Sequence, residues 1–370
     1  MPKAFRTKDF CIINFRNPRI LECTLRDGSY RIDFQFTEDD TRIIAAALER
    51  VGFDMIEVGH GVGLGATESG KGVAAESDEI YMKATAETLS TAEWGMFCIP
   101  GIASLRHIDL AAEYEMSFIR IGVNIENYID AFSFIEKAKY HGMYVCTNFM
   151  KSYVTDPDTF ARFAIEVENA GTDLVYIVDS AGGMLPREVE RYVSAIRSQS
   201  ETLAIGFHGH NNLGMAVANC LSAVEHGATI VDSSLQGFGR SAGNAPTEQL
   251  LCALIRAGYD LGIEPIAVMD CGELYIQPRI SSKGHSSIDV VAGLAQFHSS
   301  YMKLIEIYSN RYQVDPRHLI IAICNRDRTE ASESLVEAEA ERLAEDNVCG
   351  TWKPLYDKYA GGEQEPSEHR

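Results

Sequence analysis

The feature that most constrains the fold of this chain is an eightfold alternation of short apolar runs with amphipathic helical patterns. The apolar runs, which we interpret as strands, are Ile20 to Thr24, Met55 to Val58, Trp94 to Ile99, Phe118 to Gly122, Met143 to Asn148, Leu174 to Asp179, Leu203 to His208 and Ile230 to Ser233. Strands that alternate with helices in this way predict βαβ units and a parallel sheet. Eight units in roughly 240 residues match the length of a (β/α)8 TIM barrel. A doubly wound open sheet is the alternative, but no GxGxxG motif follows the first strand.

Helix-boundary signals separate the expected strands. The first helix begins with a capping Thr37 and an acidic first turn, and Gly52 ends it after a run of helically spaced apolar residues. Several later helices also end at a glycine that precedes the next strand. The later helical patterns, of which all but Pro186 to Ser198 are followed by such a glycine, are Glu126 to Tyr140, Asp156 to Ala170, Pro186 to Ser198, Leu213 to His226 and Ala245 to Ala257.

The pattern divides the chain into four segments. We expect a lead-in over residues 1–20, the barrel over 21–262, a helical C-terminal domain packed on the barrel mouth over 263–348, and a polar tail with the composition of disordered segments over 349–370. The C-terminal helices are expected at Ile288 to Asn310, near Asp315 to Cys324, and at Ser332 to Glu345. The long connection Gly59 to Glu79 is expected to form a lid or pocket wall, or else a plain surface excursion.

Charge and cysteine usage exclude several classes of protein. Lys and Arg number 33 against 53 Asp and Glu, and a net charge of −20 disfavours binding to nucleic acid or to an anionic membrane surface. The N-terminus lacks the apolar stretch of a signal peptide, and no apolar run is long enough to span a bilayer, so we expect a cytoplasmic protein. The 9 cysteines are scattered and form no CxxC motif, which favours reduced thiols in the core.

The strongest local signal for chemistry is His208-Gly209-His210 at the end of the seventh expected strand. Residues i and i+2 of a strand point to the same side, so the two imidazoles can face one point. Neutral imidazoles at the end of a barrel strand suit a divalent metal ion. Two polar loop histidines that cap the next helix are the alternative.

Arg26 and Asp27 follow the first expected strand, and in a barrel the C-terminal ends of all strands meet at one face. Asp27 with His208 and His210 would make a site of two histidines and one carboxylate that leaves about three coordination positions open. Taken alone, Arg26 and Asp27 would more simply form a surface salt bridge or a helix cap. The facing His-x-His makes a metal site with an anion-binding arginine the better account.

Five motifs in order along the chain resemble those of the DRE-TIM metallolyases, and most closely the 4-hydroxy-2-oxovalerate aldolases, which are class II pyruvate aldolases. The motifs are Leu25-Arg26-Asp27-Gly28, Glu57-Val58-Gly59-His60-Gly61, Asp179-Ser180-Ala181-Gly182, Gly206-Phe207-His208-Gly209-His210-Asn211-Asn212-Leu213-Gly214 and Gly243-Asn244-Ala245-Pro246. The similarity runs from about Leu21 to Leu343 and includes Gly293 to Tyr301, which aligns without gaps to a C-terminal motif of that family.

The resemblance implies a Mn²⁺ or Mg²⁺ ion held by Asp27, His208 and His210, with Asn244 as a further metal-side residue. It also implies that Arg26 binds the 2-oxo acid and balances charge on its enolate, and we expect His60 and Ser180 to contribute to substrate binding. The expected partners are a small 2-oxo acid and an aldehyde, and a homodimer is expected from the family alone.

The chain departs from the aldolase pattern where that family places its base and its aldehyde pocket. The family's histidine two residues after the glycine of its RDG motif is Tyr30 here, and two tyrosines of the C-terminal motif are Leu294 and His298. We therefore name Tyr30 and His298, beside Arg26, as the candidate catalytic residues. A polar helix residue in the domain interface is the alternative for His298.

The sequence thus predicts a divalent-metal-dependent aldolase that cleaves or forms a 4-hydroxy-2-oxo acid through a pyruvate-type enolate. One alternative is an acyl-CoA-dependent synthase that condenses a 2-oxo acid, and another is a catalytically silent barrel that serves as a binding subunit. The family's late Gly-Gly, which contacts an acylating aldehyde dehydrogenase, is Glu330-Ala331 here. We therefore predict that this chain has no such dehydrogenase partner.

Overall fold

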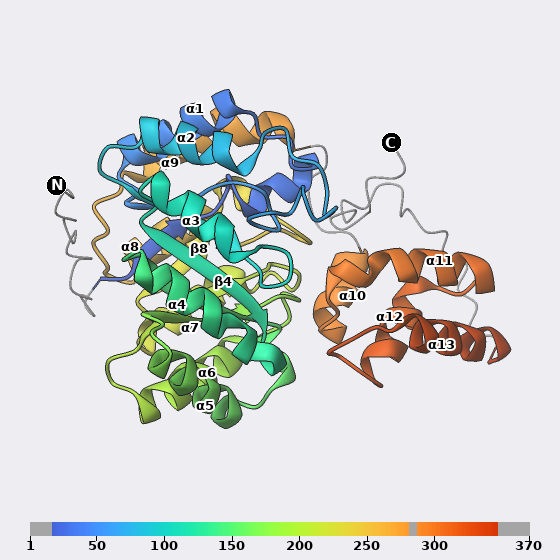
Figure 1. The fold of residues 1–370 in the computed structure, drawn as a ribbon. Helices are drawn as coiled ribbons and strands as arrows, with labels where there is room; N and C mark the ends of the chain where they lie inside the picture. The colour runs from blue at the N-terminus through green and yellow to red at the C-terminus, as the bar shows by residue number, and fades with distance from the viewer. Residues whose placement is uncertain (1–16, 281–286, 347–370) are drawn as a thin grey trace.

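The computed structural model describes residues 17–280 and 287–346, so the expected lead-in before residue 17 and the polar tail lie outside the described residues. Eight parallel strands close into a barrel in sequence order, with β1 paired to β8 (Figure 1). The predicted (β/α)8 fold is confirmed. The strands are β1 (Arg19–Glu22), β2 (Met55–Glu57), β3 (Glu93–Cys98), β4 (Phe118–Asn124), β5 (Tyr144–Met150), β6 (Leu174–Asp179), β7 (Ala204–Gly209) and β8 (Ile230–Ser233).

Helices surround the barrel, and the first shows how local chemistry sets their limits. In α1 (Glu38–Val51) the Thr37 and Asp40 side chains cap each other's backbone N–H groups, and Gly52 ends the helix at φ 110°, a left-handed value that suits glycine. The remaining helices around the barrel are α2 (Asp78–Thr88), α3 (Leu105–Glu113), α4 (Phe132–Tyr140), α5 (Pro157–Asn169), α6 (Pro186–Gln199), α7 (Ala216–Glu225) and α8 (Thr247–Arg256).

Two predicted helices are broken in the structure. The pattern Glu126 to Tyr140 divides into a 3-10 segment, Ile125–Ala131, and α4, and Asn127 within the 3-10 segment leaves helical geometry. The pattern Ile288 to Asn310 divides into α10 (Ser287–Ala295) and α11 (Met302–Tyr312). The break lies at Gln296, whose φ of 57° is left-handed, and the chain that turns there carries His298 to the barrel mouth.

Apolar side chains fill two concentric layers. The barrel interior holds a small cluster that includes Leu21, Met55, Phe118 and Tyr176. A larger cluster lies between the strands and the surrounding helices. These layers bury both faces of the sheet, which explains why most strands read as continuous apolar runs.

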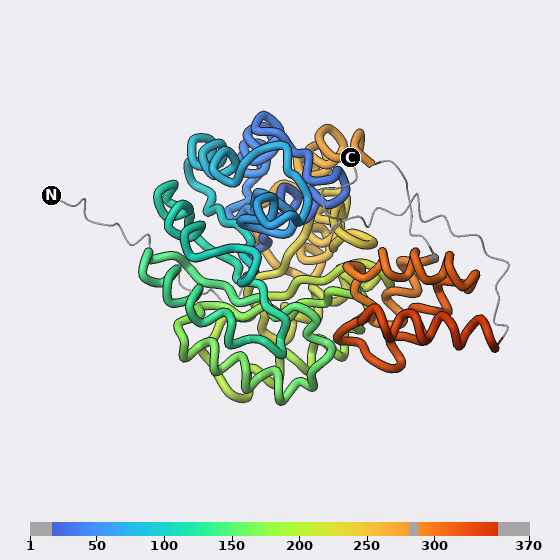
Figure 2. The backbone as a smooth tube through the Cα atoms, turned by 45° about the vertical axis from the view of Figure 1, so that its right-hand side comes forward, coloured from blue at the N-terminus to red at the C-terminus, as the bar shows by residue number. Residues whose placement is uncertain are grey.

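The C-terminal helices form a core of their own beside the barrel mouth (Figures 1 and 2). It consists of α10, α11, α12 (Pro316–Cys324) and α13 (Glu333–Glu345). The preceding α9 (Pro265–Cys271) packs instead on the barrel, where Val268 and Cys271 join the larger cluster. A boundary drawn by packing would therefore follow α9, rather than fall at residue 262, where the sequence pattern changes.

Backbone contact brings α10 onto the barrel. The carbonyl oxygen of Gly293 in α10 approaches Gly183, after β6, so closely that a Cβ at Gly183 would overlap it. On the same side Asn212 donates its amide to the carbonyl of Asp289 at 3.0 Å. Glycine at position 183 is thus what lets the C-terminal helices approach the strand ends.

We expect Gly183→Ala to push α10 away and to lower the free energy of unfolding by ~1–3 kcal/mol, since an added methyl group has no room there. Urea unfolding gives the free energy, and hydrogen exchange of the α10 amides locates the change. Gly142→Ala is the control, because Gly142 has open space around its Cβ position and only its φ of 75° opposes a side chain. Faster exchange in α10 for both variants would contradict the prediction.

The cysteines agree with the expectation of reduced core thiols. Seven lie in the described residues and none of these forms a disulfide, while Cys11 and Cys349 lie outside the described part of the chain. No helix in the described ranges combines the length and apolar composition that crossing a lipid bilayer requires.

Candidate active site

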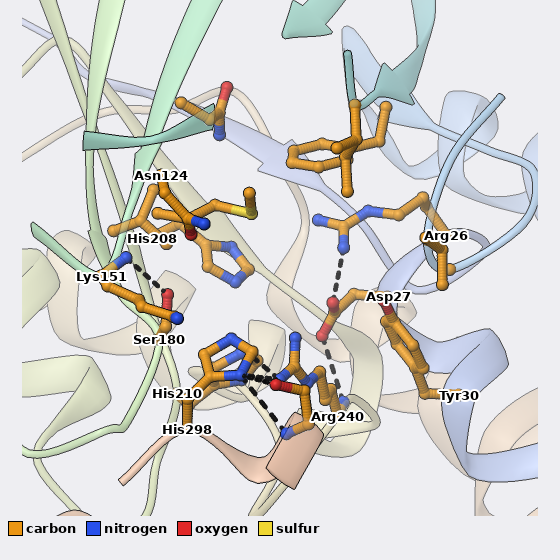
Figure 3. A pocket seen from close by; sticks show the side chains of 18 of the residues that line it. Arg26, Asp27, Tyr30, Asn124, Lys151, Ser180, His208, His210, Arg240 and His298 are labelled. Atoms are coloured by element: carbon orange, nitrogen blue, oxygen red, sulfur yellow. Dashed lines mark hydrogen bonds and ion pairs between the residues drawn. The ribbon is translucent and has the colours of Figure 1, made fainter. Parts of the chain in front are cut away.

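A pocket of about 290 Å³ opens at the C-terminal ends of the barrel strands. Its walls come from the ends of β1, β3, β4, β5, β6 and β7, from the loops after β2 and β8, and from the segment between α10 and α11. Figure 3 shows Asp27, His208 and His210 facing a common space in this pocket, with Arg26 beside Asp27. Side chains far apart in the sequence therefore converge here.

Asp27, His208 and His210 are brought together as the sequence predicted. Each offers one ligand atom, and these atoms lie within 4.8 Å of one another in a buried cluster. The two imidazole rings are 5.1 Å apart and nearly perpendicular. The local reason is that β7 ends at Gly209. His208 is the next-to-last residue of this strand, and His210 follows the strand directly.

The protonation states of this cluster suit a divalent cation. Burial lowers the pKa of His210 to about 3, so its imidazole is neutral, the form that binds metals. Burial alone would raise the pKa of Asp27, but the Arg26 guanidinium, at 2.6 Å, and the histidines hold it well below its usual value. One carboxylate and two imidazoles are a donor set that Mn²⁺ and similar divalent ions accept.

Buried polar atoms at the cluster lack protein partners. Within the described part of the chain, Nδ1 of His210 and Oδ1 of Asn244 have no hydrogen-bond partner. A buried polar group without a partner costs free energy, so a ligand at this place would relieve it. The residues present therefore fit a bound metal ion.

Asn244 supports the cluster through Asp27. Its amide nitrogen donates to Oδ2 of Asp27 at 2.7 Å, and residues 210 and 244 form an isolated bridge between their backbones. The geometry places Asn244 beside Asp27, while the role of Asn244 as a metal ligand stays a prediction.

A chain of buried ion pairs runs beneath the pocket. Arg26 contacts Asp27 at 2.6 Å and Glu57 at 2.8 Å, and Arg120 contacts the same oxygen of Glu57 at 2.7 Å. The other arm of Arg120 reaches Asp232. Asp232 in turn lies 2.8 Å from Nδ1 of His208, which leaves Nε2 of that ring for the cluster. Alternating charges thus connect two of the three candidate ligands and fix their orientation.

Sequence reasoning missed Arg120 and Asp232, although a signal was present. Both are charged residues inside runs that otherwise read as buried strands, Phe118 to Gly122 and Ile230 to Ser233. A charge in such a run must be paired, because an isolated buried charge is very costly. Searching the other expected strands for charges of opposite sign would have found the pair.

The other predicted site residues divide into two groups. Tyr30, Ser180 and His298 line the pocket, and all three are buried. His298 contacts the Arg240 guanidinium at 3.0 Å and Ser300 Oγ at 2.6 Å, and burial together with Arg240 keeps its pKa well below the usual value. Leu294 is 67% exposed on α10 and is not part of the pocket lining.

His60 is not among the residues that line the pocket, and its role in substrate binding stays a prediction. Its ring stacks on Phe34 with centroids 3.9 Å apart, its Nδ1 accepts from the backbone of Val62, and its Nε2 lies 3.3 Å from the carbonyl of Gly72. Both ring nitrogens are therefore engaged in holding the long connection after β2. The His60 side chain therefore stabilises the loop after β2.

Two further cations line the pocket and were not singled out from the sequence. Lys151 follows β5 directly, and Arg240 lies in the loop after β8. Neither stands in a recognisable motif, and Lys151 lies three residues beyond the expected end of its strand. Only the fold shows that they share a wall with His298.

Comparison with known proteins gives one family and named relatives. Residues 17–274 match the HMGL-like family. The chain is 36% identical over 332 residues to 4-hydroxy-2-oxovalerate aldolase 2 of Nocardia farcinica, across 89% of this chain and 95% of that protein. It is 39% identical over 271 residues to oxaloacetate decarboxylase of Mycobacterium tuberculosis, across 73% of this chain and 78% of that protein.

Solved structures show the same fold at low sequence identity. The carboxyl transferase domain of Rhizobium etli pyruvate carboxylase superposes with a TM-score of 0.75 at 16% identity, across 90% of this chain and 61% of that one. The N-terminal domain of a candidate aldolase from Bacteroides vulgatus gives 0.66 at 22% identity, across 79% of this chain and 96% of that one. At these sequence identities the structural similarity shows a shared fold alone.

Proposed function

This chain belongs to the HMGL-like family, and from that membership we propose that it is a divalent-metal-dependent aldolase that cleaves or forms a 4-hydroxy-2-oxo acid. The observation that carries the proposal is the cluster of Asp27, His208 and His210 with Arg26 beside it. A relative named as an aldolase matches nearly the whole chain, which supports the same reaction.

Asp27, His208 and His210 would hold the metal ion, with Asn244 beside them, and we propose Mn²⁺ or Mg²⁺. When bound, such an ion supplies Lewis-acid polarisation of the 2-oxo carbonyl. The chain keeps its own donors in the binding form: Asp27 is ionised and His210 is neutral. The pairing of His208 with Asp232 fixes which ring nitrogen is available.

Arg26 is the proposed residue for the 2-oxo acid. Its guanidinium lines the pocket and is held by Asp27 and Glu57, which leaves part of its planar donor fork for the ligand. Arginine can bind a carboxylate or an enolate oxygen through two parallel hydrogen bonds, which lysine cannot do. We therefore assign to Arg26 the stabilisation of negative charge on the three-carbon half of the substrate.

The reaction in the cleavage direction is balanced without a further reactant. The C4 hydroxyl loses its proton, the C3–C4 bond breaks, and its electron pair remains on C3 as the pyruvate enolate while C4 becomes an aldehyde. Protonation of C3 then gives pyruvate. We propose His298 as the group that takes the hydroxyl proton, because its imidazole lines the pocket, with Tyr30 and Ser180 orienting the hydroxyl.

Asn148 adds a polar contact that the sequence did not assign. It lines the pocket at the end of β5, and its buried Oδ1 has no hydrogen-bond partner among the described residues. An acceptor of this kind fits a substrate hydroxyl. The proposed homodimer, the cytoplasmic location and the lack of a dehydrogenase partner remain predictions from the sequence.

The similarity to an oxaloacetate decarboxylase raises a second candidate reaction. Loss of CO₂ from oxaloacetate leaves the same pyruvate enolate, so one site could support either cleavage. The two differ in the group that leaves C3, and a direct assay separates them.

The test is to supply the full-length protein, loaded with Mn²⁺, with a panel of 4-hydroxy-2-oxo acids and with oxaloacetate, and to follow pyruvate with a coupled dehydrogenase. We expect pyruvate from at least one 4-hydroxy-2-oxo acid, and we expect a chelator to abolish its release. Arg26→Lys should lower kcat/KM by ~10²–10³-fold, the usual effect of losing one donor to a developing oxyanion.

Arg50→Lys is the matched control, because Arg50 is an exposed arginine on α1 and should leave the rate unchanged. Pyruvate from oxaloacetate alone would favour the decarboxylase. Release of CoA from an acyl-CoA and a 2-oxo acid, with no pyruvate from any panel member, would refute the aldolase in favour of a condensing synthase.

A further inference from the structure

The charge of the pocket exceeds what a 2-oxo acid and a metal site require. Three cations line it, Arg26, Lys151 and Arg240, whereas Asp27 is the only carboxylate among its described lining residues. Asp27 is already engaged by Arg26 and by the proposed metal site. Lys151 and Arg240 therefore lie on the part of the wall that is not assigned to the 2-oxo acid.

Lys151 is held in this wall by the backbone. It adopts φ 56° and ψ 43°, a left-handed conformation that is uncommon for residues other than glycine, and its backbone N–H donates to Oγ of Ser180 at 3.0 Å. Such strain persists only where the surrounding structure enforces it. The lysine is 6% exposed, and Figure 3 shows it across the pocket from Arg26.

In the described part of the chain, the Lys151 ammonium donates its hydrogen bonds to neutral groups. It donates to the carbonyl of Thr329 at 2.7 Å and to the hydroxyl of Tyr301 at 3.2 Å. Across the described ranges no carboxylate lies within the 4.0 Å of an ion pair to Lys151, and Glu126, Glu330 and Asp327 act on it from further away. A buried cation without a counter-charge is costly, so its site calls for an anion.

Arg240 adds a second cation to the same wall. Its guanidinium contacts Ser299 and the neutral His298, each at 3.0 Å, and its backbone N–H donates to Asp27 at 3.2 Å. Its charge also acts on Lys151 and lowers the pKa of that ammonium, after the larger effect of burial. An anion between the two groups would turn this mutual repulsion into attraction to both.

We propose that Lys151 and Arg240 form a second anion subsite, and that the half of the substrate remote from the 2-oxo acid carries an acidic group. This rests on the proposed function, since it names the substrate class of the same site. The acidic group is a carboxylate or a phosphate monoester, both of which lysine and arginine bind. The aldehyde released on cleavage is then an anionic aldehyde rather than a simple alkyl one.

A binding experiment tests the subsite without requiring turnover. 2-Oxoglutarate and 2-oxovalerate have the same chain length, lack the C4 hydroxyl needed for cleavage, and differ only in their far end, a carboxylate or a methyl group. By titration calorimetry with the Mn²⁺-loaded full-length protein, we expect 2-oxoglutarate to bind ~10–100-fold more tightly, the range of one or two charge-assisted hydrogen bonds.

Lys151→Met should remove most of this preference, and Lys151→Arg should retain it. The alternative role of Lys151, a purely structural link to Thr329 and Tyr301, would weaken both ligands equally and leave their ratio unchanged. Equal affinities for the two ligands in the wild type, or an unchanged ratio in Lys151→Met, would overturn the proposal.

Turnover identifies the source of the acidic group. We compare kcat/KM for 4-hydroxy-2-oxoglutarate, 2-oxo-3-deoxy-6-phosphogluconate and 4-hydroxy-2-oxovalerate, whose far ends are a carboxylate, a phosphate and a methyl group. A preference for either charged substrate that Lys151→Met abolishes supports the subsite, whereas preference for the methyl substrate refutes it. If no compound releases pyruvate, the proposed function fails, while the calorimetric comparison still decides the subsite.

Discussion

Replacing Asp27 by asparagine is expected to abolish the binding of divalent cations and to lower kcat for pyruvate release by on the order of 10³-fold, since Lewis-acid stabilisation amounts to several kcal/mol. Asp27 is the single carboxylate of the three-residue cluster, and Arg26 and the histidines keep it ionised. Asparagine has nearly the same shape but no charge. The variant therefore removes charge while leaving the pocket's shape unchanged.

Two measurements report the loss of cation binding directly. They are the metal content after dialysis against Mn²⁺ and the rise in Tm on adding Mn²⁺. The wild type should gain stability from the ion, because a ligand that binds only the folded state raises Tm. Asp39→Asn is the control, an exposed carboxylate in the first turn of α1 that should leave both readouts unchanged. An Asp27→Asn protein that binds Mn²⁺ as tightly as the wild type would contradict the assigned site.

The second large effect is expected from Arg120→Met, which should lower the free energy of unfolding by ~3–5 kcal/mol, the usual cost of breaking a buried ion pair from one side. The Arg120 side chain is fully buried between Glu57 and Asp232 and lies over the Tyr176 ring. Methionine replaces its volume but leaves two buried carboxylates without their cation. The position of His208, which Asp232 orients, should loosen as well.

The loss of unfolding free energy in Arg120→Met should be smaller at low pH than at high pH. Burial by itself raises the pKa of Asp232, but Arg120 and His208 hold that pKa below its usual value in the wild type. In the wild type, the ionised Asp232 therefore stabilises the folded state at any pH above the unfolded-state pKa of this carboxyl. This stabilisation is lost only in strong acid. Without Arg120 burial prevails, the carboxyl pKa rises, and protonation relieves the cost. The difference in free energy of unfolding between the wild type and Arg120→Met should thus become smaller as pH falls from ~8 to ~5.

Urea unfolding at several pH values measures both effects. Arg106→Met is the matched control, because Arg106 pairs with Glu68 on the surface, with 72% of its side chain exposed, and should cost less than ~1 kcal/mol. Adding Glu57→Gln to Arg120→Met should restore part of the stability by removing one unpaired charge. A loss no larger than that of the Arg106 variant would show that the buried network contributes little.

The ion-pair network also links the cluster of Asp27, His208 and His210 to the barrel interior. Arg26 and Arg120 share Glu57, so the carboxylate at one end and the histidine at the other are positioned by one continuous set of contacts. A change in the middle of this network should alter the geometry at both ends. The site is therefore built into the barrel interior and does not rest on its loops alone.

The long loop after β2 shows that a residue in a motif picked out from the sequence can hold a loop in place. His60 belongs to a motif that the sequence picked out, and its neighbour Glu57 does support the site. The side chain of His60 instead packs on Phe34 and bonds within the loop. The direction of a side chain after the last strand residue depends on how the loop folds, which strand periodicity does not specify.

The sequence by itself determined the barrel and the convergence of Asp27, His208 and His210. Eight buried strands read as continuous apolar runs, and the C-terminal ends of parallel strands must share one face, so Asp27, His208 and His210 could be placed together from their positions alone. Only the tertiary structure decided the rest. It paired Arg120 with two distant carboxylates and turned Lys151, Arg240 and His298 from separate segments into one wall. The reason is physical: strand periodicity is a local property, whereas charge partners and pocket walls depend on three-dimensional distances between elements.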